Sequence, residues 1–562
     1  MAAVLGISAH YHDAAAALVV DGRIVAAQQE ERLSRVKNDP SLPRQAIDAC
    51  LALGGLRGPD LDRVVFYENP YRKLERILVG ALGAFPRGAR FFRRALRDQL
   101  GDKLWVLDEL AAHCGVPRAR VDFVAHHASH AASALDTAPF GEAVALTIDG
   151  VGEAESTAIW RPGPGGPEAL TALEHPHSLG LFYAAITAFL GFRVNEGEYK
   201  VMGLAAFGEP RFREALDRMV TLHDDGAFTL RPDAFGDHLR LDRAYGDAMV
   251  RALGPPRDPH RPWDLEATAD RHYADVAASA QDLLEDAVLG LARAAHRRSG
   301  ARHLVLAGGV ALNCRANARV LAEGPFGRVY VHPAAGDAGG ALGAALLGAR
   351  QLGDTPDPGS FTPALGVRVD PGHTAAVAAH LGLRGERVAD PAADAAARLA
   401  EGAIVAWVQG RAEWGPRALG QRSLLTRADD ESLRDVLNRR IKGREPFRPF
   451  APAVRTAHAA ALFEGAPNDM TPTMTTVCRV AGEGLAGATH VDGTARVQTV
   501  EPGGALDPLL EALERDHGLR AVLHTSLNAA GEPLVARGTD ALDFFVRRKP
   551  DVLYVEDLRI TR

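Results

Sequence analysis

The sequence predicts a mixed α/β protein in two parts, with a larger amino-terminal part built from two similar halves. Three apolar segments lie between residues 3 and 27, and Asp21-Gly22 separates the second from the third. An Asp-Gly pair between apolar runs is a strong signal for a tight β-hairpin. The same order recurs at residues 144–160, where an apolar run passes through a Gly-rich loop into another apolar run. We interpret this repetition as a duplicated half.

Length and composition indicate a globular protein of several domains. The 562 residues exceed what one hydrophobic core covers, and the 47% hydrophobic and 24% charged fractions are ordinary. A formal net charge of -7 gives no electrostatic footprint for nucleic acid. The cysteines are far apart, as in a reduced protein, and no apolar run is long enough to span a bilayer. We expect a cytoplasmic protein with no nucleic-acid partner and no membrane partner.

Two histidines four positions apart lie between the two hairpins. His126 and His130 belong to an Ala/Ser-rich segment that favours helix, where this spacing puts both imidazoles on one face. The apolar run that follows is a predicted buried strand that ends at Asp149. Two imidazoles and one carboxylate suit a divalent metal such as iron and leave coordination positions for a substrate. The alternative interpretation is two unconnected histidines.

The repeated hairpins are the opening of the actin-like or sugar-kinase-type ATPase fold, which holds nucleotide in a cleft between its halves. A predicted strand that runs into Gly308-Gly309 and then a helix allows backbone amides to approach a phosphate or ribose. The alternative for such a pair is an ordinary turn. A second acidic loop brings Asp337 near the same cleft, although by itself Asp337 is a helix N-cap. We expect the nucleotide-binding residues to be Gly150, Gly152, Lys200, Gly308, Gly309 and Asn313.

A second domain follows a segment rich in Gly, Asp, Pro and Thr. We expect domains at 1–350 and 386–562, joined by a linker at 351–385. The second domain carries two loops rich in cations, 409–423 and 442–452, in which prolines prevent a continuous helix. Such cations suit the recognition of phosphate or carbamate oxygens, and the alternative is a solvated basic surface. Near the carboxyl end, Ser526 and Asn528 either hydrogen-bond a ligand or cap a turn.

Taken together, these motifs resemble the ATP-dependent O-carbamoyltransferases, a family that includes the tobramycin, cephalosporin and nodulation-factor carbamoyltransferases. The resemblance covers nearly the whole chain in the family's order. It rests on His12-Asp13, HHASHAAS, TIDGVGE, GEYKVMGLAAFG, AGGVALN, GDAGGALGAA, QGRAEWGPRALGQRS, IKGREPFRPFAP, RVQTV and HTSLNAAGEP.

The resemblance implies two active sites. The smaller α/β domain is similar to threonylcarbamoyl-adenylate synthases and would join carbamoyl phosphate and ATP, with Mg2+, into an enzyme-held carbamoyl adenylate. Its implied catalytic residues are Arg417, Lys442, Arg448, Arg496 and Ser526. The larger domain would transfer the carbamoyl group to a hydroxyl of a small natural product, with release of AMP. There His12, at its unperturbed pKa, is the implied general base.

The resemblance also implies a metal centre in the larger domain. Its ligands would be His126, His130, Asp149 and Asp337, and its ion Fe2+ or another divalent metal. Residues 185–270 carry no readable motif, so the acceptor that they are expected to bind stays unidentified. The resemblance alone suggests a homodimer.

Three other functions stay open. An actin-like-fold small-molecule kinase or ATPase would give ADP, and it leaves the basic second domain without a role. A tRNA threonylcarbamoyl-transfer enzyme predicts salt-sensitive RNA binding, which an acidic chain does not favour. A sensor of carbamoyl phosphate and nucleotide would need neither His12 nor the full set of cations.

Overall fold

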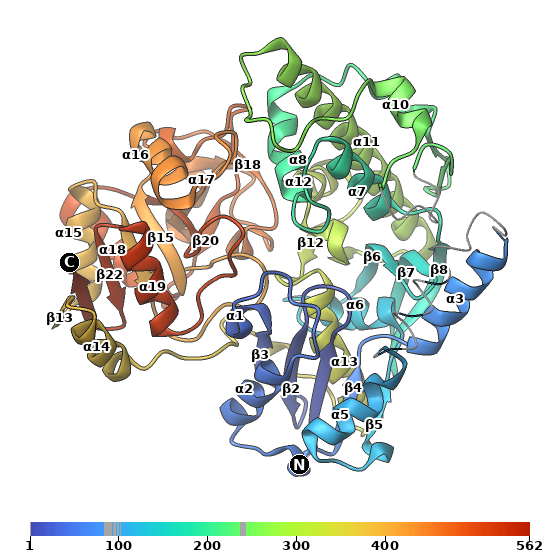
Figure 1. Ribbon diagram of the computed structural model, residues 1–562, viewed down its shortest axis with the longest axis horizontal. Coiled ribbons are helices and arrows are strands. Elements are labelled where there is room, and N and C mark those ends of the chain that lie inside the picture. The colour runs from blue at the N-terminus through green and yellow to red at the C-terminus, as the bar shows by residue number, and fades with distance from the viewer. Residues whose placement is uncertain (1, 84–92, 94–96, 98–100, 102, 236–242) are drawn as a thin grey trace. The chain divides into compact units, whose positions relative to one another are not determined.

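The computed structural model describes residues 2–83, 93, 97, 101, 103–235 and 243–562 (Figure 1). These residues form two compact units. The first comprises residues 1–25, 40–44 and 54–361, and the second comprises 26–39, 45–53 and 362–562. No helix among the described residues has the length and apolar character that a membrane crossing requires.

Two five-stranded sheets with one strand order underlie the first unit. The first sheet has the order β3-β2-β1-β4-β5, and the second has the order β12-β11-β6-β7-β8. In each sheet the first strand of the half pairs antiparallel with the second and parallel with the fourth. If the strands of each sheet are numbered along the chain within their own half, both sheets have the order third, second, first, fourth, fifth. This identity of order confirms the predicted duplication and the predicted fold class.

The strands of the two sheets have the following bounds. The first sheet contains β1 (Ala3–Ser8), β2 (Ala15–Val20), β3 (Arg23–Gln29), β4 (Arg63–Phe66) and β5 (Val121–Phe123). The second contains β6 (Ala143–Gly152), β7 (Glu155–Gly163), β8 (Gly166–Glu174), β11 (His303–Ala307) and β12 (Arg328–Val331). A two-stranded sheet pairs β9 (Val220–Leu222) with β10 (Phe228–Leu230). The helices are α3 (Pro70–Gly83), α5 (Val106–Cys114), α6 (His126–Leu135), α7 (Leu179–Phe189), α8 (Glu198–Leu204), α9 (Arg213–Asp217), α10 (Asp247–Leu253), α11 (Thr268–Ser299), α12 (Cys314–Glu323) and α13 (Asp337–Gln351).

Local sequence explains how the halves are built. All six residues of β1 are buried, and Asp21 and Gly22 take φ values of 49° and 73°, as a type I′ hairpin turn requires. Helix α13 packs against β1 and α6 (Figure 1). A Cβ on Gly343 would lie 1.7 Å from the carbonyl oxygen of Ser129. The small residues of α13 therefore let two helices approach closely, one from each half.

Two details of the metal-ligand segments differ from expectation. Strand β6 does not end at Asp149, because the β6–β7 register shifts between Ile148 and Gly152 and leaves Asp149 in a bulge. Asp337 is the first residue of α13 rather than its N-cap, which is Gly336. Asp149 therefore lies in an irregular part of a strand, and Asp337 lies at the start of a helix.

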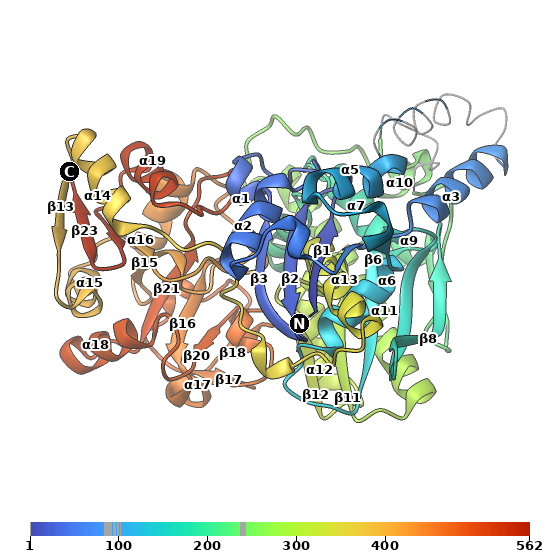
Figure 2. The same cartoon turned by 90° about the horizontal axis from the view of Figure 1, so that it is seen from below.

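An eight-stranded mixed sheet forms the centre of the second unit. Its order is β13-β23-β22-β14-β15-β21-β16-β20. Alternate residues of β14 join separate hydrophobic clusters, Ala406 and Val408 in one, Val405 and Trp407 in the other. The sheet is thus buried on both faces. Helices α15 and α18 lie side by side over one face, as Figure 2 shows.

The elements of the second unit have the following bounds. The large sheet contains β13 (Arg384–Arg387), β14 (Val405–Val408), β15 (Arg422–Arg427), β16 (Ala451–Arg455), β20 (Gln498–Val500), β21 (Ala521–Ser526), β22 (Val552–Val555) and β23 (Leu558–Thr561). A small sheet contains β17 (Phe463–Glu464), β18 (Cys478–Val480) and β19 (Thr494–Ala495). The helices are α1 (Glu31–Ser34), α2 (Arg44–Gly54), α14 (Pro371–His380), α15 (Pro391–Ala400), α16 (Glu431–Val436), α17 (Thr456–Leu462), α18 (Asp507–His517) and α19 (Gly538–Arg548).

The compact units do not follow chain order as simply as the predicted boundaries of 1–350, 351–385 and 386–562. Residues 26–39 and 45–53 pack with the second unit, where the backbone of Val367 donates to the side chain of Gln28 at 3.1 Å. The guanidinium of Arg32 donates to the carbonyls of Glu413 and Gly415 in the same unit. Helix α14 lies inside the predicted linker. The boundaries themselves stay a prediction.

Candidate functional site

Four side chains of the first unit converge on one point. Donor atoms of His126, His130, Asp149 and Asp337 all lie within 4.8 Å of one another. His126 Nε2 is 3.0 Å from Asp149 Oδ2 and 3.1 Å from His130 Nε2. Asp337 Oδ1 is 3.6 Å from His130 Nε2 and 3.8 Å from His126 Nε2. Donors bound about 2.1 Å from one ion lie roughly 3.0–3.4 Å apart, so the cluster is close to the size that a metal requires.

The fold delivers these donors from the same edge of the two sheets. His126 is the first residue of α6 and His130 lies one turn further along the same face. Asp149 lies in the bulge of β6, where its Oδ1 accepts a hydrogen bond of 3.0 Å from the backbone N–H of Gly309. Asp337 begins α13. Secondary structure, rather than a flexible loop, therefore holds most of the centre.

His130 and the two carboxylates of this cluster shift one another's pKa values. Burial lowers the pKa of His130, but the carboxylates of Asp149 and Asp337 outweigh it and raise that pKa to about 9. Burial likewise raises the pKa of Asp149, yet His126 and His130 bring it well below its usual range. The site thus holds two buried carboxylates beside two imidazoles, and a divalent cation would neutralise them. Two nitrogens and two oxygens fit such an ion and leave two octahedral positions for substrate.

His12 lies on the loop between β1 and β2, close to these ligands. Its Nδ1 is 3.0 Å from Asp13 Oδ2, and both His10 and Asp13 take positive φ values, 69° and 55°. Residues other than glycine seldom adopt this conformation, and it often marks functional loops. Burial lowers the pKa of His12, but Asp13 and Asp337 outweigh it and raise that pKa to about 10. The pKa of His12 therefore lies above the unperturbed value expected from the sequence.

Two of the predicted nucleotide-binding glycines lie against members of the four-donor cluster, and a third lies against the strand that carries Asp149. A Cβ on Gly152 would lie 2.0 Å from Cδ2 of His126, and one on Gly309 would lie 2.9 Å from Oδ1 of Asp149. Gly308 has a φ of +91°, and a Cβ there would lie 2.2 Å from the carbonyl oxygen of Ile148. These glycines make room for the four-donor cluster and for the strand that carries it.

The other three predicted nucleotide-binding residues have different surroundings. A Cβ on Gly150 would meet nothing within 4 Å. Lys200 lies on α8 with its Nζ 5.4 Å from the centre of the Phe192 ring. The side chain of Asn313 caps α12 and exchanges two hydrogen bonds of 2.9 Å with Gln281. Nucleotide binding by all six residues stays a prediction.

In the second unit, sheet register brings the predicted catalytic residues to one edge. Strands β15 and β16 both run antiparallel to β21, so each begins where β21 ends at Ser526. Strand β20 runs parallel to β16 and begins at the same edge. Arg417, Arg448 and Arg496 precede β15, β16 and β20 by a few residues each. Four adjacent strands therefore gather three arginines and one serine at one edge.

Lys442 lies at the same edge and is buried. It ends a π-helical turn, Leu437–Lys442, that continues α16, so the helix changes its pitch before the lysine. Its Nζ lies 2.7 Å from the carbonyl oxygens of Ser526 and Asn528, 2.7 Å from Asn528 Oδ1 and 3.3 Å from Ser526 Oγ. Burial, and then Arg444 and Arg448, hold the pKa of Lys442 well below its usual range. The amine thus orders the turn that follows β21.

Buried charges shape the loop that carries Arg417. One carboxylate oxygen of Glu413 accepts hydrogen bonds from the backbone N–H groups of Leu419, Gln421 and Arg422, at 2.8 to 2.9 Å. The Arg422 guanidinium is buried and donates to carbonyls including that of Gln409, at 2.8 Å. Reasoning from the sequence treated both residues only as part of a motif, because nothing local distinguishes an arginine that holds a loop from one that faces a substrate.

Sequence reasoning also missed residues around the metal centre. Glu153 accepts hydrogen bonds from the backbone N–H groups of His126 and Asn69, at 3.1 and 2.6 Å, and so caps the start of α6. Tyr67 and Glu68, directly after β4, lie beside two of the metal ligands. Their position in the duplicated fold could have identified Tyr67 and Glu68. They follow β4, and Gly308-Gly309 follow β11, the corresponding strand of the other half.

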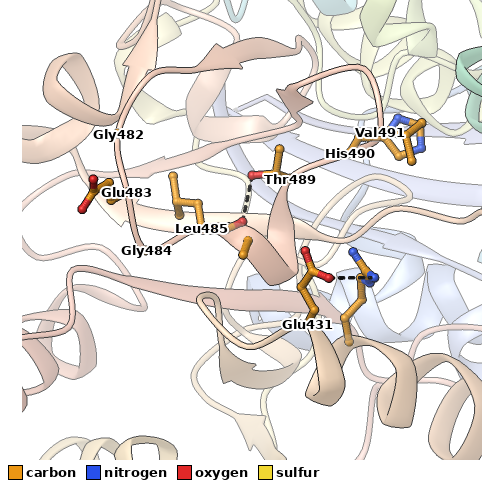
Figure 3. A pocket seen from close by; sticks show the side chains of 10 residues that line it. Glu431, Gly482, Glu483, Gly484, Leu485, Thr489, His490 and Val491 are labelled. Carbon is orange, nitrogen blue, oxygen red and sulfur yellow. Dashed lines mark hydrogen bonds and ion pairs between the residues drawn. The ribbon is translucent and has the colours of Figure 1, made fainter.

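A surface hollow of about 640 Å³ lies elsewhere on the second unit (Figure 3). It is lined by Glu431, Arg434, Gly482, Glu483, Gly484, Leu485, Ala486, Thr489, His490 and Val491. Glu431 pairs with Arg434 at 3.8 Å, and Thr489 Oγ1 donates to the Leu485 carbonyl at 2.8 Å. No predicted site residue lines this hollow.

Comparison with known proteins places the sequence in context. The family model described as "Carbamoyltransferase N-terminus" matches residues 3–346, and the one described as "Carbamoyltransferase C-terminus" matches residues 396–562. A protein of Synechocystis described as uncharacterized is 39% identical over 100% of this chain and 97% of its own length. The nodulation protein NolNO of Sinorhizobium fredii is 36% identical over 97% of this chain and 78% of its own. The 3'-hydroxymethylcephem-O-carbamoyltransferase of Streptomyces clavuligerus is 36% identical over 45% of this chain and 48% of its own.

Proposed function

Because the chain belongs to the carbamoyltransferase family, we propose that this enzyme forms carbamoyl adenylate and transfers its carbamoyl group to a hydroxyl of a small natural product. A relative named as an O-carbamoyltransferase supports a hydroxyl as the acceptor. The observation that carries the adenylate step is the gathering of Arg417, Arg448, Arg496 and Lys442 around Ser526 at one edge of the second unit's sheet.

Adenylate formation requires a site that holds two anionic substrates. Water cleaves carbamoyl phosphate into carbamate and phosphate, and a carbamate oxygen then attacks the α-phosphorus of Mg-bound ATP and displaces pyrophosphate. Arg417, Arg448 and Arg496 bind the phosphate and carbamate oxygens, and preorganised contacts of this kind are each worth roughly 3–4 kcal/mol in the transition state. Lys442 holds the turn at Ser526, whose hydroxyl orients the carbamate.

Carbamoyl transfer belongs to the first unit. The acceptor oxygen attacks the carbamoyl carbon, and the bond between that carbon and the phosphate oxygen breaks to release AMP. His126, His130, Asp149 and Asp337 would hold Fe2+ or another divalent ion, which supplies Lewis-acid polarisation of the carbamoyl or phosphate oxygens. His12 takes the hydroxyl proton, with Asp13 fixing its ring through Nδ1.

The raised pKa of His12 gives the transfer step a pH dependence. A base with a pKa of about 10 is mostly protonated at pH 7, and its deprotonated fraction rises about tenfold per pH unit below that pKa. We expect the transfer rate to rise with pH from 7 towards 10, while adenylate formation by the other unit does not follow this titration. A transfer rate that falls as the pH rises over that range would contradict His12 as the base.

The acceptor class rests on the relatives. One relative carries the name of a cephem carbamoyltransferase and another that of a nodulation protein, which supports an antibiotic, toxin or sugar-like acceptor here. We propose that residues 185–270 contribute to its binding, and of these 236–242 lie outside the described residues. A cytoplasmic location, a homodimer and the absence of nucleic-acid and membrane partners are part of the same proposal.

Mass spectrometry tests the adenylate step. The full chain is incubated with ATP, carbamoyl phosphate and Mg2+, without acceptor. Carbamoyl adenylate with released pyrophosphate supports the proposal and leaves acceptors to be screened. Formation of ADP with added sugars or polyols, and no adenylate, would instead support a kinase. No product in either reaction would support a sensor.

A further inference from the structure

We propose that Glu68 is the positioning residue that sets the metal affinity of the four-donor centre, through His126. This inference rests on the metal site of the proposed function. Glu68 is 4% exposed and lies directly after β4. Its Oε2 is 3.9 Å from Nδ1 of His126, on the far side of the ring from the other donors.

The hydrogen on the His126 ring gives Glu68 this role. With Nε2 facing Asp149 and His130, an imidazole that binds a metal through Nε2 carries its hydrogen on Nδ1. That Nδ1 is buried with no hydrogen bond, and a buried donor without an acceptor is destabilising by about 1–3 kcal/mol. A relative movement of about 1 Å brings the Glu68 carboxylate into hydrogen-bond range. The bond would fix the ring's orientation and make Nε2 a better ligand.

Glu68 is itself held in place. Both of its oxygens accept hydrogen bonds from Lys73 Nζ, at 2.8 and 3.1 Å, and the Lys73 side chain is only 12% exposed. The preceding residue, Tyr67, directs its hydroxyl to Asp337 Oδ2 at 3.4 Å. A Cβ on Gly340 would lie 2.7 Å from the Tyr67 ring, so that glycine admits the tyrosine. Two consecutive residues therefore support one ligand each.

The duplicated fold gives this position a counterpart. In the second half, Gly308-Gly309 follow β11, the strand that corresponds to β4, and the Gly309 N–H holds Asp149. The residues after the fourth strand thus contact a ligand in both halves, through a backbone amide in one half and through side chains in the other.

A purely structural role makes a different prediction. The ion pair with Lys73 ties Glu68 to α3, and if this were its whole purpose, removing either partner would have the same effect. Orientation of His126 needs only the carboxylate. Loss of Lys73, which only steadies the carboxylate, would then lower metal affinity less than loss of Glu68.

The test measures binding of Co2+ alone to the full-length protein after its metal has been removed with a chelator. Affinity comes from competition with a chromophoric chelator, and ligand geometry from the visible absorption of bound Co2+. We expect Glu68→Ala to weaken binding about 10–100-fold, as losses of such outer-shell groups do. Glu68→Gln should weaken it less, because an amide oxygen still accepts from Nδ1. Lys73→Met should lose less affinity than Glu68→Ala, because the carboxylate remains. Glu155→Ala, which removes a nearby carboxylate paired with Arg72, should bind as the wild type does.

The outcomes separate this inference from the function on which it rests. Equal affinity in Glu68→Ala and the wild type overturns it, as does an equal loss in Glu68→Ala and Lys73→Met. A wild-type chain that binds no Co2+ overturns it together with the metal site. If the chain makes no carbamoyl adenylate while Glu68→Ala still weakens Co2+ binding, the proposed function fails and the inference stands. Thermal unfolding checks each variant, and Glu68→Gln carries the test through its Co2+ spectrum if Glu68→Ala does not fold.

Discussion

Gly152→Ala separates two roles for a glycine that the sequence assigned to nucleotide binding. Neither Gly152 nor Gly150 has a positive φ, so the backbone at both positions accepts alanine. A methyl group on Gly152 would lie 2.0 Å from Cδ2 and 2.3 Å from Cγ of His126, whereas one on Gly150 would meet nothing within 4 Å. The two glycines differ in the neighbours that an added methyl group would meet, and for Gly152 that neighbour is a proposed metal ligand.

The size of the effect follows from these distances. Ordinary contact begins at 3.4 Å, so the His126 ring must retreat by about 1.4 Å, or β6 must move instead. Metal ligands tolerate displacements of only about 0.2 Å, so the variant loses His126 as a donor. We expect Co2+ affinity to fall by about 100-fold or more, beyond the loss of a supporting residue. Overpacking should also lower the free energy of unfolding by about 1–3 kcal/mol.

The assay compares Gly152→Ala, Gly150→Ala and the wild type by Co2+ competition and by urea unfolding. Gly150→Ala is expected to match the wild type in both measurements. A Gly152→Ala variant with wild-type Co2+ affinity would refute the packing role. If both variants instead lose AMP release during transfer while metal affinity is unchanged, the glycines approach the nucleotide as the sequence predicted.

Three further changes test other parts of the chain. Lys442→Ala removes the amine that holds the Ser526 turn and should abolish the formation of carbamoyl adenylate. His12→Ala should leave adenylate formation intact and stop carbamoyl transfer. If mass spectrometry shows an equal loss of adenylate in both variants, the division into two sites is contradicted. Asn313→Ala loses the α12 cap and the Gln281 pair, so urea unfolding should show a loss of about 2–3 kcal/mol with adenylate formation unchanged. Burial, with a smaller contribution from Arg496, lowers the pKa of His524 from 6.5 to about 3. Between these two pH values the native state binds fewer protons than the unfolded chain does. The free energy of unfolding therefore falls as the pH falls through that window. Between pH 7 and 4.5 this should amount to about 3 kcal/mol, and His524→Leu should flatten that part of the stability curve in urea titrations.

Local physics explains which parts of the fold the sequence predicted. The turn at Asp21-Gly22 depends on two residues that tolerate positive φ, and the His126–His130 spacing depends on helical periodicity. Neither needs information from distant parts of the chain. The strand order of each half then follows from the recurrence of the same local signals.

Long-range packing explains what the sequence did not reveal. The segment 26–39 falls inside the predicted domain 1–350, yet it packs with the second unit through Gln28 and Arg32. Gly152 reads as part of a phosphate-binding loop, and only the neighbouring His126 ring gives it a packing role. From the sequence, Lys442 is interpreted as a substrate-facing cation. Its oxygen partners nevertheless belong to a distant turn, 84 and 86 residues further along the chain.

Duplication explains why one centre draws on so many distant segments. The loop after β1, the first strand of one half, carries His12, and a bulge within β6, the first strand of the other half, carries Asp149. The helices after β5 and β12, the fifth strands, begin with His126 and Asp337. Corresponding segments of the two halves therefore carry the residues that we propose as metal ligands and base.

The two halves have nonetheless diverged at each corresponding position. An imidazole in one half stands where the other has a carboxylate, and Glu68 follows the strand whose counterpart is followed by Gly309. In the proposed reaction, this divergence would let one ion be bound by two imidazoles and two carboxylates while His12 stays outside the ligand set. The asymmetry between the halves would then fit a duplicated scaffold to a single proposed transfer site.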